Sequence, residues 1–350
     1  MIHKILMCGN EACGEGAILA GCRFYAGYPI TPQNELTAYI AKRMNETDGV
    51  FIQAESELAA INMVFGASAA GVRAMTSSSS PGISLKQEGI SYLAGCELPC
   101  VIVNVQRGGP GLGNIGPSQA DYFQAVKGGG HGDYKLIVLA PATAQEMMEH
   151  TILAFELADK YRNPVFILSD GLLGQMMEPI RMPTVLQKSH DKPWALTGCK
   201  GRSPNIIRSL YLGDGVLEAQ NKKLQEKFNR MKETEVRAQT FNTKDSDLIL
   251  VAYGSVARIA KAAMDEARAG GLKVGLIRPV TLWPFPEKII ADACSRTKKF
   301  LVVEMSAGQM VEDVKLAVNG RARVDFYGRM GGGVPSEEEI LQQIETLMKI

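Results

Sequence analysis

The sequence predicts an α/β protein built on parallel sheets whose two faces are both covered by helices. Short, nearly continuous apolar runs alternate along the chain with amphipathic segments of helix length. The runs lack the strict alternation of apolar and polar residues that marks a strand with one solvated face. With 350 residues, of which 46% are hydrophobic, the chain is long enough for two domains with full cores.

The first domain is predicted over residues 1–182, before the composition changes near residue 181. A long helix is expected after a capping box formed by Thr143 and Glu146, because apolar residues then recur at helical spacing. Three buried strands are expected here, at 100–106 (CVIVNVQ), 135–141 (KLIVLAP) and 164–170 (PVFILSD).

Residues 183–244 are polar and contain prolines, so they predict a connector with one exposed, highly charged helix. A second α/β domain is predicted over 245–350. Its last helix should begin at a capping box of Ser336 and Glu339. The strands expected in it are 247–254, 273–279, 298–305 and 322–328, and the helices are 255–269, 286–296, 308–319 and 337–349.

Charge and cysteine content limit the possible functions. The formal net charge of +1 gives no basic field for nucleic acid or an anionic membrane. No apolar run approaches the roughly 20 residues that span a bilayer, and the N-terminus lacks a signal-peptide pattern, so we expect a cytoplasmic protein. The seven cysteines form no C-x-x-C pair and the four histidines do not cluster with them. We therefore expect no disulfide framework, zinc site or iron–sulfur cluster on this chain.

Residues 24–35 read FYAGYPITPQNE, and the two prolines stiffen the end of an apolar segment. This pattern predicts Thr31 as the N-cap of a helix that runs from Pro32 to about Met44. The unpaired backbone N–H groups at such a helix start can bind an anion. The alternative interpretation is a well-capped helix start without a ligand.

Residues 53–89 carry a second candidate site. Glu55 and Glu57 precede a helix of small residues and a short strand, and a loop from Ser77 to Gly82 then opens another helix. A glutamate at the head of a closely packed helix should be partly buried, where its charge needs a partner or its pKa must rise. A salt-bridged surface carboxylate is the alternative.

Arg107 follows an apolar strand and precedes a glycine-rich loop in NVQRGGPGLG. Such loops hold a side chain at the carboxyl edge of a parallel sheet, where α/β proteins bind ligands. A guanidinium group there can hold a carboxylate through two parallel hydrogen bonds. A surface arginine in a plain turn is the alternative.

These stretches together resemble a known family. The glutamate, small-residue helix, short strand and TSSSSPG turn are similar to the pyrimidine-binding domain of thiamine diphosphate enzymes. With YPITP, QAESELAAINM, QRGGPGLGN and GGGHGDY, essentially the whole chain resembles the α subunit of the 2-oxoacid:ferredoxin oxidoreductases, and its branched-chain members most of all. Residues 245–350 resemble a transketolase C-terminal domain.

The resemblance implies oxidative decarboxylation of a 2-oxo acid, 3-methyl-2-oxobutanoate in the branched-chain members, to acyl-coenzyme A with reduction of ferredoxin. It implies that Glu57 bonds N1′ of the thiamine aminopyrimidine, with Glu55 as the local competitor, and that Thr31 and Arg107 hold the oxo acid. The cofactor-binding residues that it implies are Glu57, Ser80, Pro81 and Gly82.

The same resemblance implies a split active site. A β chain would bring the diphosphate side and Mg²⁺, a ferredoxin-like δ chain would carry iron–sulfur clusters, and a γ chain would complete the assembly. The alternative substrate is 2-oxoglutarate. A rival from another class is a non-catalytic module that binds nucleotides or small molecules, although the chain lacks the arrangement of a dinucleotide site.

Several motifs have no assigned role. Asp121 and His131 match the family pattern, and we expect a structural role for the histidine. The run 213–215 (GDG) followed by Asn242 formally fits the diphosphate and Mg²⁺ motif of thiamine enzymes, but a charged helix lies between them. The glycine-rich loop 328–336 is expected to be a helix entry rather than a phosphate site.

Overall fold

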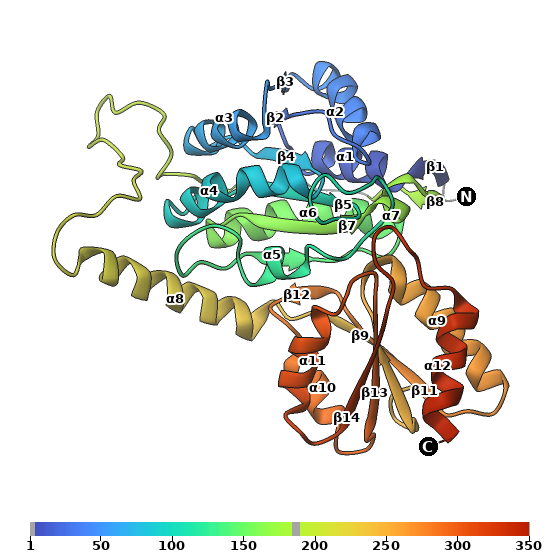
Figure 1. The fold of residues 1–350 in the computed structure, drawn as a ribbon. Coiled ribbons are helices and arrows are strands. Elements are labelled where there is room, and N and C mark those ends of the chain that lie inside the picture. The colour runs from blue at the N-terminus through green and yellow to red at the C-terminus, as the bar shows by residue number, and fades with distance from the viewer. Residues whose placement is uncertain (1–3, 184–189, 350) are drawn as a thin grey trace.

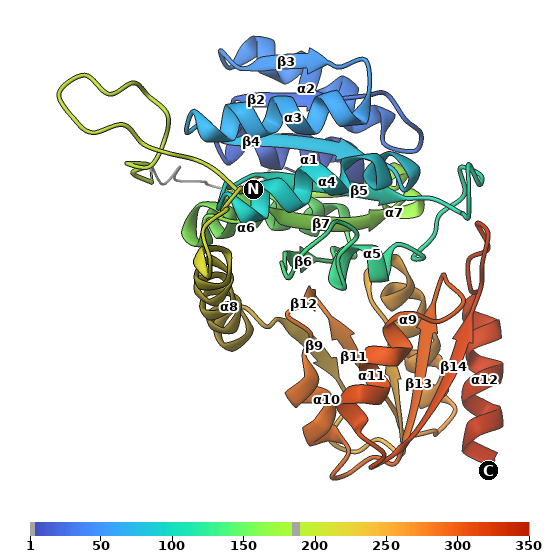
Figure 2. The same ribbon diagram turned by 60° about the vertical axis from the view of Figure 1, so that its left-hand side comes forward.

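The computed structural model describes residues 4–183 and 190–349 and consists of two α/β units, each built on its own sheet (Figures 1 and 2). The first unit has a seven-stranded sheet in the order β12-β6-β7-β5-β4-β2-β3. All neighbours pair in parallel except β12, which is antiparallel to β6. Its strands are β2 (Phe24–Gly27), β3 (Val50–Gln53), β4 (Ala74–Ser78), β5 (Val101–Gln106), β6 (Ile137–Leu139), β7 (Val165–Asp170) and β12 (Thr281–Trp283).

Helices cover both faces of this sheet. Helices α1, α2 and α6 pack against one another on one face, and α3 and α4 pack together on the other (Figures 1 and 2). A two-stranded antiparallel sheet of β1 (Lys4–Cys8) and β8 (Met177–Arg181) lies beside α1 and α6. The helices are α1 (Gly9–Leu19), α2 (Asn34–Glu46), α3 (Glu57–Ala69), α4 (Pro81–Gly95), α5 (Tyr122–Val126), α6 (Ala144–Tyr161) and α7 (Gly171–Gln175).

The second unit has a five-stranded sheet in the order β14-β13-β10-β11-β9, in which only β9 is antiparallel to its neighbour. Helices α9 and α12 pack on one face, and α10 and α11 on the other (Figure 1). The elements are β9 (Ala238–Phe241), β10 (Leu248–Val251), α9 (Gly254–Ala269), β11 (Val274–Pro279), α10 (Glu287–Ala293), β13 (Lys299–Glu304), α11 (Met310–Val318), β14 (Arg323–Gly328) and α12 (Glu337–Lys349).

Both predicted capping boxes lie at helix starts, but only the one at α12 is complete. At α12, Ser336 and Glu339 exchange backbone and side-chain hydrogen bonds. At α6, the Thr143 hydroxyl accepts from the Glu146 N–H, but the Glu146 carboxylate turns away from the box. It accepts instead from the Ala142 N–H and pairs with Arg278 of the second unit, so it joins the two units.

Two short strands that were not predicted depart from the expected division of the chain. Strand β9 lies inside 183–244 and is nevertheless part of the second sheet, so that sheet begins before residue 245. Strand β12 follows β11 in sequence but joins the first sheet. The 183–244 range does contain the charged helix α8 (Val216–Thr234), which buries Phe228 edge-on against Trp283. The boundaries of the domains themselves stay a prediction.

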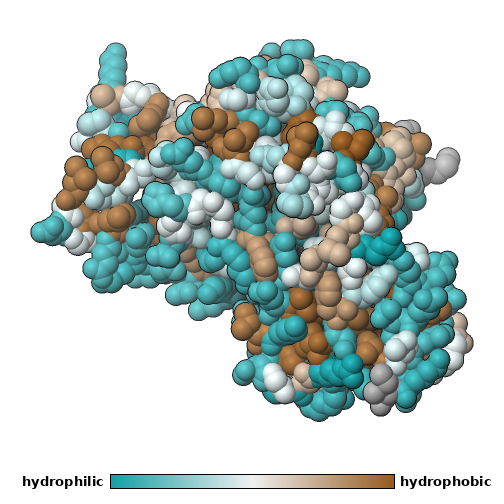
Figure 3. Space-filling view, viewed as in Figure 1, coloured by the Kyte–Doolittle hydropathy of each residue, from teal (hydrophilic) through white to brown (hydrophobic). Residues whose placement is uncertain are grey.

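The segment before α8 extends away from the first unit (Figures 1 and 2). It carries exposed apolar side chains, and Figure 3 shows the corresponding hydrophobic surface at the left of the molecule. Within the described ranges, no helix is long and apolar enough to cross a membrane. The exposed apolar residues of the segment are Leu196, Ile206, Leu210 and Leu212.

Candidate functional site

Glu57 is the first residue of α3. The Ser56 hydroxyl caps this helix by accepting from the Ala59 N–H at 3.1 Å. The Glu57 side chain is buried, with the residue only 5% exposed, whereas the competing Glu55 is exposed. Among the hydrogen bonds and ion pairs of the described residues, none involves the Glu57 carboxylate. Glu57 is therefore a buried acid without a partner in this part of the chain.

The Glu57 carboxylate lies against the start of α4. A Cβ atom added to Gly82 would sit 2.4 Å from Glu57 Oε1 and 2.1 Å from Ser78 Oγ. A side chain at position 82 would overlap the Glu57 carboxylate and the Ser78 hydroxyl, so only glycine fits there. The hydroxyls of Ser78 and Ser79 are buried and have no hydrogen-bond partner among the described residues. The end of β4 and the start of α4 thus form a buried polar surface around the carboxylate.

Ser80 turns the chain from β4 into α4 with φ near +30°, in the left-handed region that non-glycine residues rarely adopt. Three neighbours hold this turn. The Ser80 N–H donates to Asn104 at 3.0 Å, its hydroxyl donates to the Asp121 carboxylate at 2.6 Å, and the Arg107 N–H donates to that hydroxyl at 3.0 Å. Asp121, unassigned from the sequence, therefore fixes the turn. Burial raises the pKa of its carboxyl, and the bonds from Ser80 and Asn104 oppose the rise.

Arg107 is 8% exposed and joins two predicted loops. Its Nη1 donates to the Thr31 carbonyl and its Nη2 to the Leu112 carbonyl, both at 3.0 Å. Its Nε is buried without a hydrogen-bond partner in the described part of the chain. The structure thus brings Thr31 and Arg107 together, as a shared site requires.

The predicted start of the helix after Thr31 is wrong. Helix α2 begins at Asn34, with Gln33 in the N-cap position, and Thr31 Oγ1 accepts from the Asn34 side chain. Gln33 is fully buried, and its side-chain oxygen accepts hydrogen bonds from Ser77 at 2.5 Å and from Thr37 at 3.0 Å. This contact between α2 and β4, distant in sequence, shifts the helix start by two residues.

Lys86 is a site residue that sequence reasoning missed. It lies on α4, is 0% exposed, and its Nζ donates to Thr76 Oγ1 at 2.7 Å and to the Ser77 carbonyl at 2.9 Å. Burial lowers the pKa of its ammonium group to about 7, and the nearby charge of Glu57 opposes this shift. The sequence signal that could have indicated Lys86 is its spacing, because it is four residues after Gly82 and therefore shares its helix face.

The remaining motifs do not add to this site. His131 is exposed, and its backbone carbonyl accepts from the Ser91 hydroxyl. The 213–215 run and Asn242 are exposed. The 328–336 loop lies against the loop after β5, where the Asn114 side chain donates to the Gly331 carbonyl at 2.7 Å.

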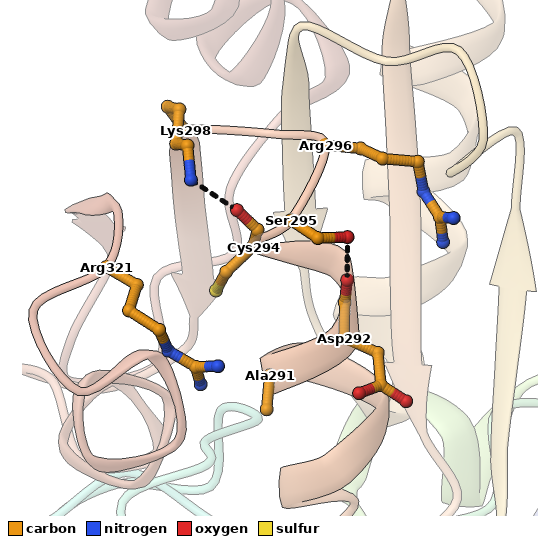
Figure 4. Close-up of a pocket in the computed structure, with 7 residues that line it drawn as sticks. All are labelled: Ala291, Asp292, Cys294, Ser295, Arg296, Lys298 and Arg321. Atoms are coloured by element: carbon orange, nitrogen blue, oxygen red, sulfur yellow. Dashed lines mark hydrogen bonds between the residues drawn. The ribbon is translucent and has the colours of Figure 1, made fainter.

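A cavity of about 680 Å³ lies elsewhere, in the second unit (Figure 4). Two of its cations already bind carbonyls at helix ends: Lys298 donates to Cys294, and Arg321 to Ala317. Cations commonly occupy such helix ends for structural reasons. No group of three or more His, Cys, Asp or Glu side chains that could hold a metal ion occurs within residues 4–183 and 190–349.

Comparisons with known proteins assign the class. Residues 15–241 match a family model described as pyruvate flavodoxin/ferredoxin oxidoreductase, thiamine diP-binding. Residues 246–340 match pyruvate:ferredoxin oxidoreductase core domain II. Together with the sheets described above, these matches define a thiamine diphosphate-binding α/β protein of the oxidoreductase class.

Comparison with individual relatives shows the family within this class. The chain is 53% identical over 340 residues to ketoisovalerate oxidoreductase subunit VorB of Methanothermobacter marburgensis, covering 97% of this chain and 96% of the relative. It is 38% identical over 372 residues to 2-oxoglutarate synthase subunit KorA of the same organism, covering 98% and 99%. The chain therefore belongs to the 2-oxoacid:ferredoxin oxidoreductase family as an α-type subunit. It is an enzyme subunit, not a non-catalytic binding module.

Two solved structures agree with the fold. One is 2-oxoglutarate:ferredoxin oxidoreductase from Magnetococcus marinus with 2-oxoglutarate, coenzyme A and succinyl-CoA bound, at a TM-score of 0.88 and 29% identity. The match covers 98% of this chain and 65% of the solved chain, so this chain spans less than two thirds of that one. The other is a split-gene transketolase, an inactive β4 tetramer, at a TM-score of 0.61 and 14% identity, with 98% of both chains covered. This second likeness concerns the fold alone.

Proposed function

We propose that this chain is the α-type subunit of a complex that oxidatively decarboxylates 3-methyl-2-oxobutanoate to an acyl-coenzyme A and CO₂, with reduction of ferredoxin. The relatives named ketoisovalerate oxidoreductase subunits, at 53% and 51% identity, support this substrate over 2-oxoglutarate, whose synthase subunits are 38% and 37% identical. The observation that carries the proposal is the buried carboxylate of Glu57, which has no partner within the described residues.

The residues around Glu57 fit the pyrimidine side of thiamine diphosphate. The hydroxyls of Ser78 and Ser79 have no partner among the described residues, and the missing side chain of Gly82 lets the carboxylate and the Ser78 hydroxyl approach the start of α4 closely. When bound, the coenzyme supplies an electron sink for decarboxylation. Glu57 would hold a proton at ring nitrogen N1′, and the Ser80–Gly82 turn would position the ring beside it. A carboxyl in such a dry setting is suited to proton exchange with a ring nitrogen.

Thr31 and Arg107 would bind the oxo acid. Their connection through the Thr31 carbonyl places a guanidinium group, a hydroxyl and the start of α2 at one point. The unpartnered Arg107 Nε provides a donor for a substrate carboxylate. Gln33, two residues after Thr31, bonds Ser77, and the Arg107 N–H bonds the Ser80 hydroxyl that Asp121 holds, so little ordering would be required when the substrate arrives.

The rest of the active site would come from other chains. A β chain would bind the diphosphate group and Mg²⁺, a ferredoxin-like δ chain would carry the iron–sulfur clusters, and a γ chain would complete a cytoplasmic complex that uses coenzyme A and ferredoxin. The relatives are named as subunits, which supports an assembly of several chains.

The test is the Glu57→Gln variant in the complex isolated through a tag on this chain. Reduction of a viologen dye is measured with 3-methyl-2-oxobutanoate and with 2-oxoglutarate, each with coenzyme A. We expect turnover to fall by about 10²–10⁴-fold with the assembly intact, because the acid–base group is lost. The matched control is Glu55→Gln, since that neighbouring carboxylate is exposed.

A mild effect of Glu57→Gln together with a severe effect of Glu55→Gln would assign the role to Glu55. Faster turnover of 2-oxoglutarate would identify that acid as the substrate. Activity of this chain by itself would refute the split active site.

A further inference from the structure

Lys86 is a fully buried cation whose hydrogen-bond partners are all neutral. Its Nζ bonds the Thr76 hydroxyl and the Ser77 carbonyl, both on β4, and it takes part in none of the ion pairs of the described residues. A buried ammonium group without a counter-charge is costly, so such lysines either lose their proton or have an acid nearby.

The surrounding elements contain one buried acid. The strands β2, β4 and β5 carry no charged residue, and their one titratable side chain is the Tyr25 hydroxyl, which bonds Ser77. The only charged residue of α3 is Glu57. On α4 itself, the one acid is Glu88, which is exposed and accepts from Tyr92.

The helix geometry places the two charges beside each other. The Glu57 carboxylate contacts α4 at Gly82, and Lys86 is one helical turn further along the same face. The two groups form no direct ion pair, so the attraction between them acts through space, and the Glu57 charge opposes the lowering of the Lys86 pKa. In a site with little water such an attraction stays strong.

We propose that Lys86 is a positioning residue whose buried positive charge attracts the Glu57 carboxylate and directs it at the coenzyme ring. This inference rests on the proposed function of Glu57. The alternative is a structural lysine that only ties α4 to β4 through its two hydrogen bonds.

A double-mutant cycle on the full-length chain without coenzyme separates these roles. The free energy of unfolding in urea is measured for the wild type, Glu57→Gln, Lys86→Met and the double variant at pH 6 and pH 9. At pH 6, where Lys86 is protonated, we expect the two substitutions to be coupled by roughly tenfold or more in the folding equilibrium constant. At pH 9, where Lys86 is neutral, the coupling factor in the folding equilibrium constant should fall towards one, which means no coupling.

Two variants serve as matched controls. Glu88→Gln removes the exposed acid of the same helix, and Lys227→Met removes another buried lysine, which lies on α8 and pairs with Glu97. Neither should show pH-dependent coupling to Glu57→Gln. A Lys86→Met effect that is equal in the wild-type and Glu57→Gln backgrounds at both pH values would overturn the proposal and leave a structural lysine.

If Lys86→Met does not fold, Glu57→Gln carries the test by itself. It must destabilise the chain more at pH 6 than at pH 9, because the cation then loses its counter-charge only where it is protonated. An effect of the same size at both pH values would overturn the proposal. Since no coenzyme is present, this outcome is independent of the activity assay that tests the proposed function.

Discussion

Replacing Gly82 with alanine would test the contact on which the site depends. The added Cβ would lie 2.4 Å from Glu57 Oε1 and 2.1 Å from Ser78 Oγ. An ordinary contact is near 3.5 Å, so one or both groups must move by about 1 Å. Both are ends of side chains, so overpacking should lower the free energy of unfolding by only about 1–3 kcal/mol. A misplacement of about 1 Å at a catalytic group can nevertheless cost about 10²-fold in rate.

The assay is turnover of the isolated complex with 3-methyl-2-oxobutanoate, with urea unfolding of the chain in parallel. Gly66→Ala is the matched control, because this glycine lies in α3 and its added Cβ meets nothing within 4 Å. That change should raise the free energy of unfolding by about 0.5–1 kcal/mol, since alanine is the better helix former. Wild-type turnover in Gly82→Ala would refute the assigned position of Glu57.

Three further predictions concern neighbouring residues. Arg107→Ala should raise the KM for the oxo acid by about tenfold or more with a smaller change in kcat, and an unchanged KM in saturation kinetics would make Arg107 structural. Asp121→Asn should lower the free energy of unfolding by about 1–2 kcal/mol, because the Ser80 hydroxyl loses a charged acceptor; equal urea midpoints would contradict this. Burial lowers the pKa of His150 to about 4, below its unfolded value, so acidification from pH 7 to pH 5 should cost about 2 kcal/mol in the wild type. The His150→Gln chain should lack this loss, and parallel pH profiles of the two chains would refute it.

The strands that could be predicted are those buried on both faces. β5 and β7 are buried at every position, and their continuous apolar sequences indicate this directly. The strands β9 and β12 have only four and three residues and occur where another strand offers an edge. Strand β9 pairs with β11 within the second unit and β12 pairs with β6 of the first, so both depend on tertiary contacts that local sequence does not encode.

The candidate residues of the site could be predicted from the sequence, but the contacts between them could not. Glu57, Thr31 and Arg107 follow from local motifs and the family resemblance, and the structure places Arg107 on the Thr31 carbonyl. The helix start after Thr31 was wrong because Gln33 bonds Ser77, a residue of a distant strand. Lys86 was missed because a lysine in a helix is ordinarily solvated, whereas this one is buried with its Nζ bonded to Thr76 and Ser77 of β4.

The four hydroxyl-bearing residues from Thr76 to Ser79 are unusual for the end of a central parallel strand. A central strand of a parallel sheet is expected to be apolar, yet all four residues are fully buried. Thr76 and Ser77 bond the Ala26 carbonyl and Gln33, so their cost is offset within the chain. Ser78 and Ser79 have no such partner in the described residues, and the Ser78 hydroxyl lies beside the unpartnered carboxylate of Glu57 at Gly82. Buried polar groups are retained where something must satisfy them. The coenzyme ring that we propose beside Glu57 would present such hydrogen-bonding atoms at the end of β4.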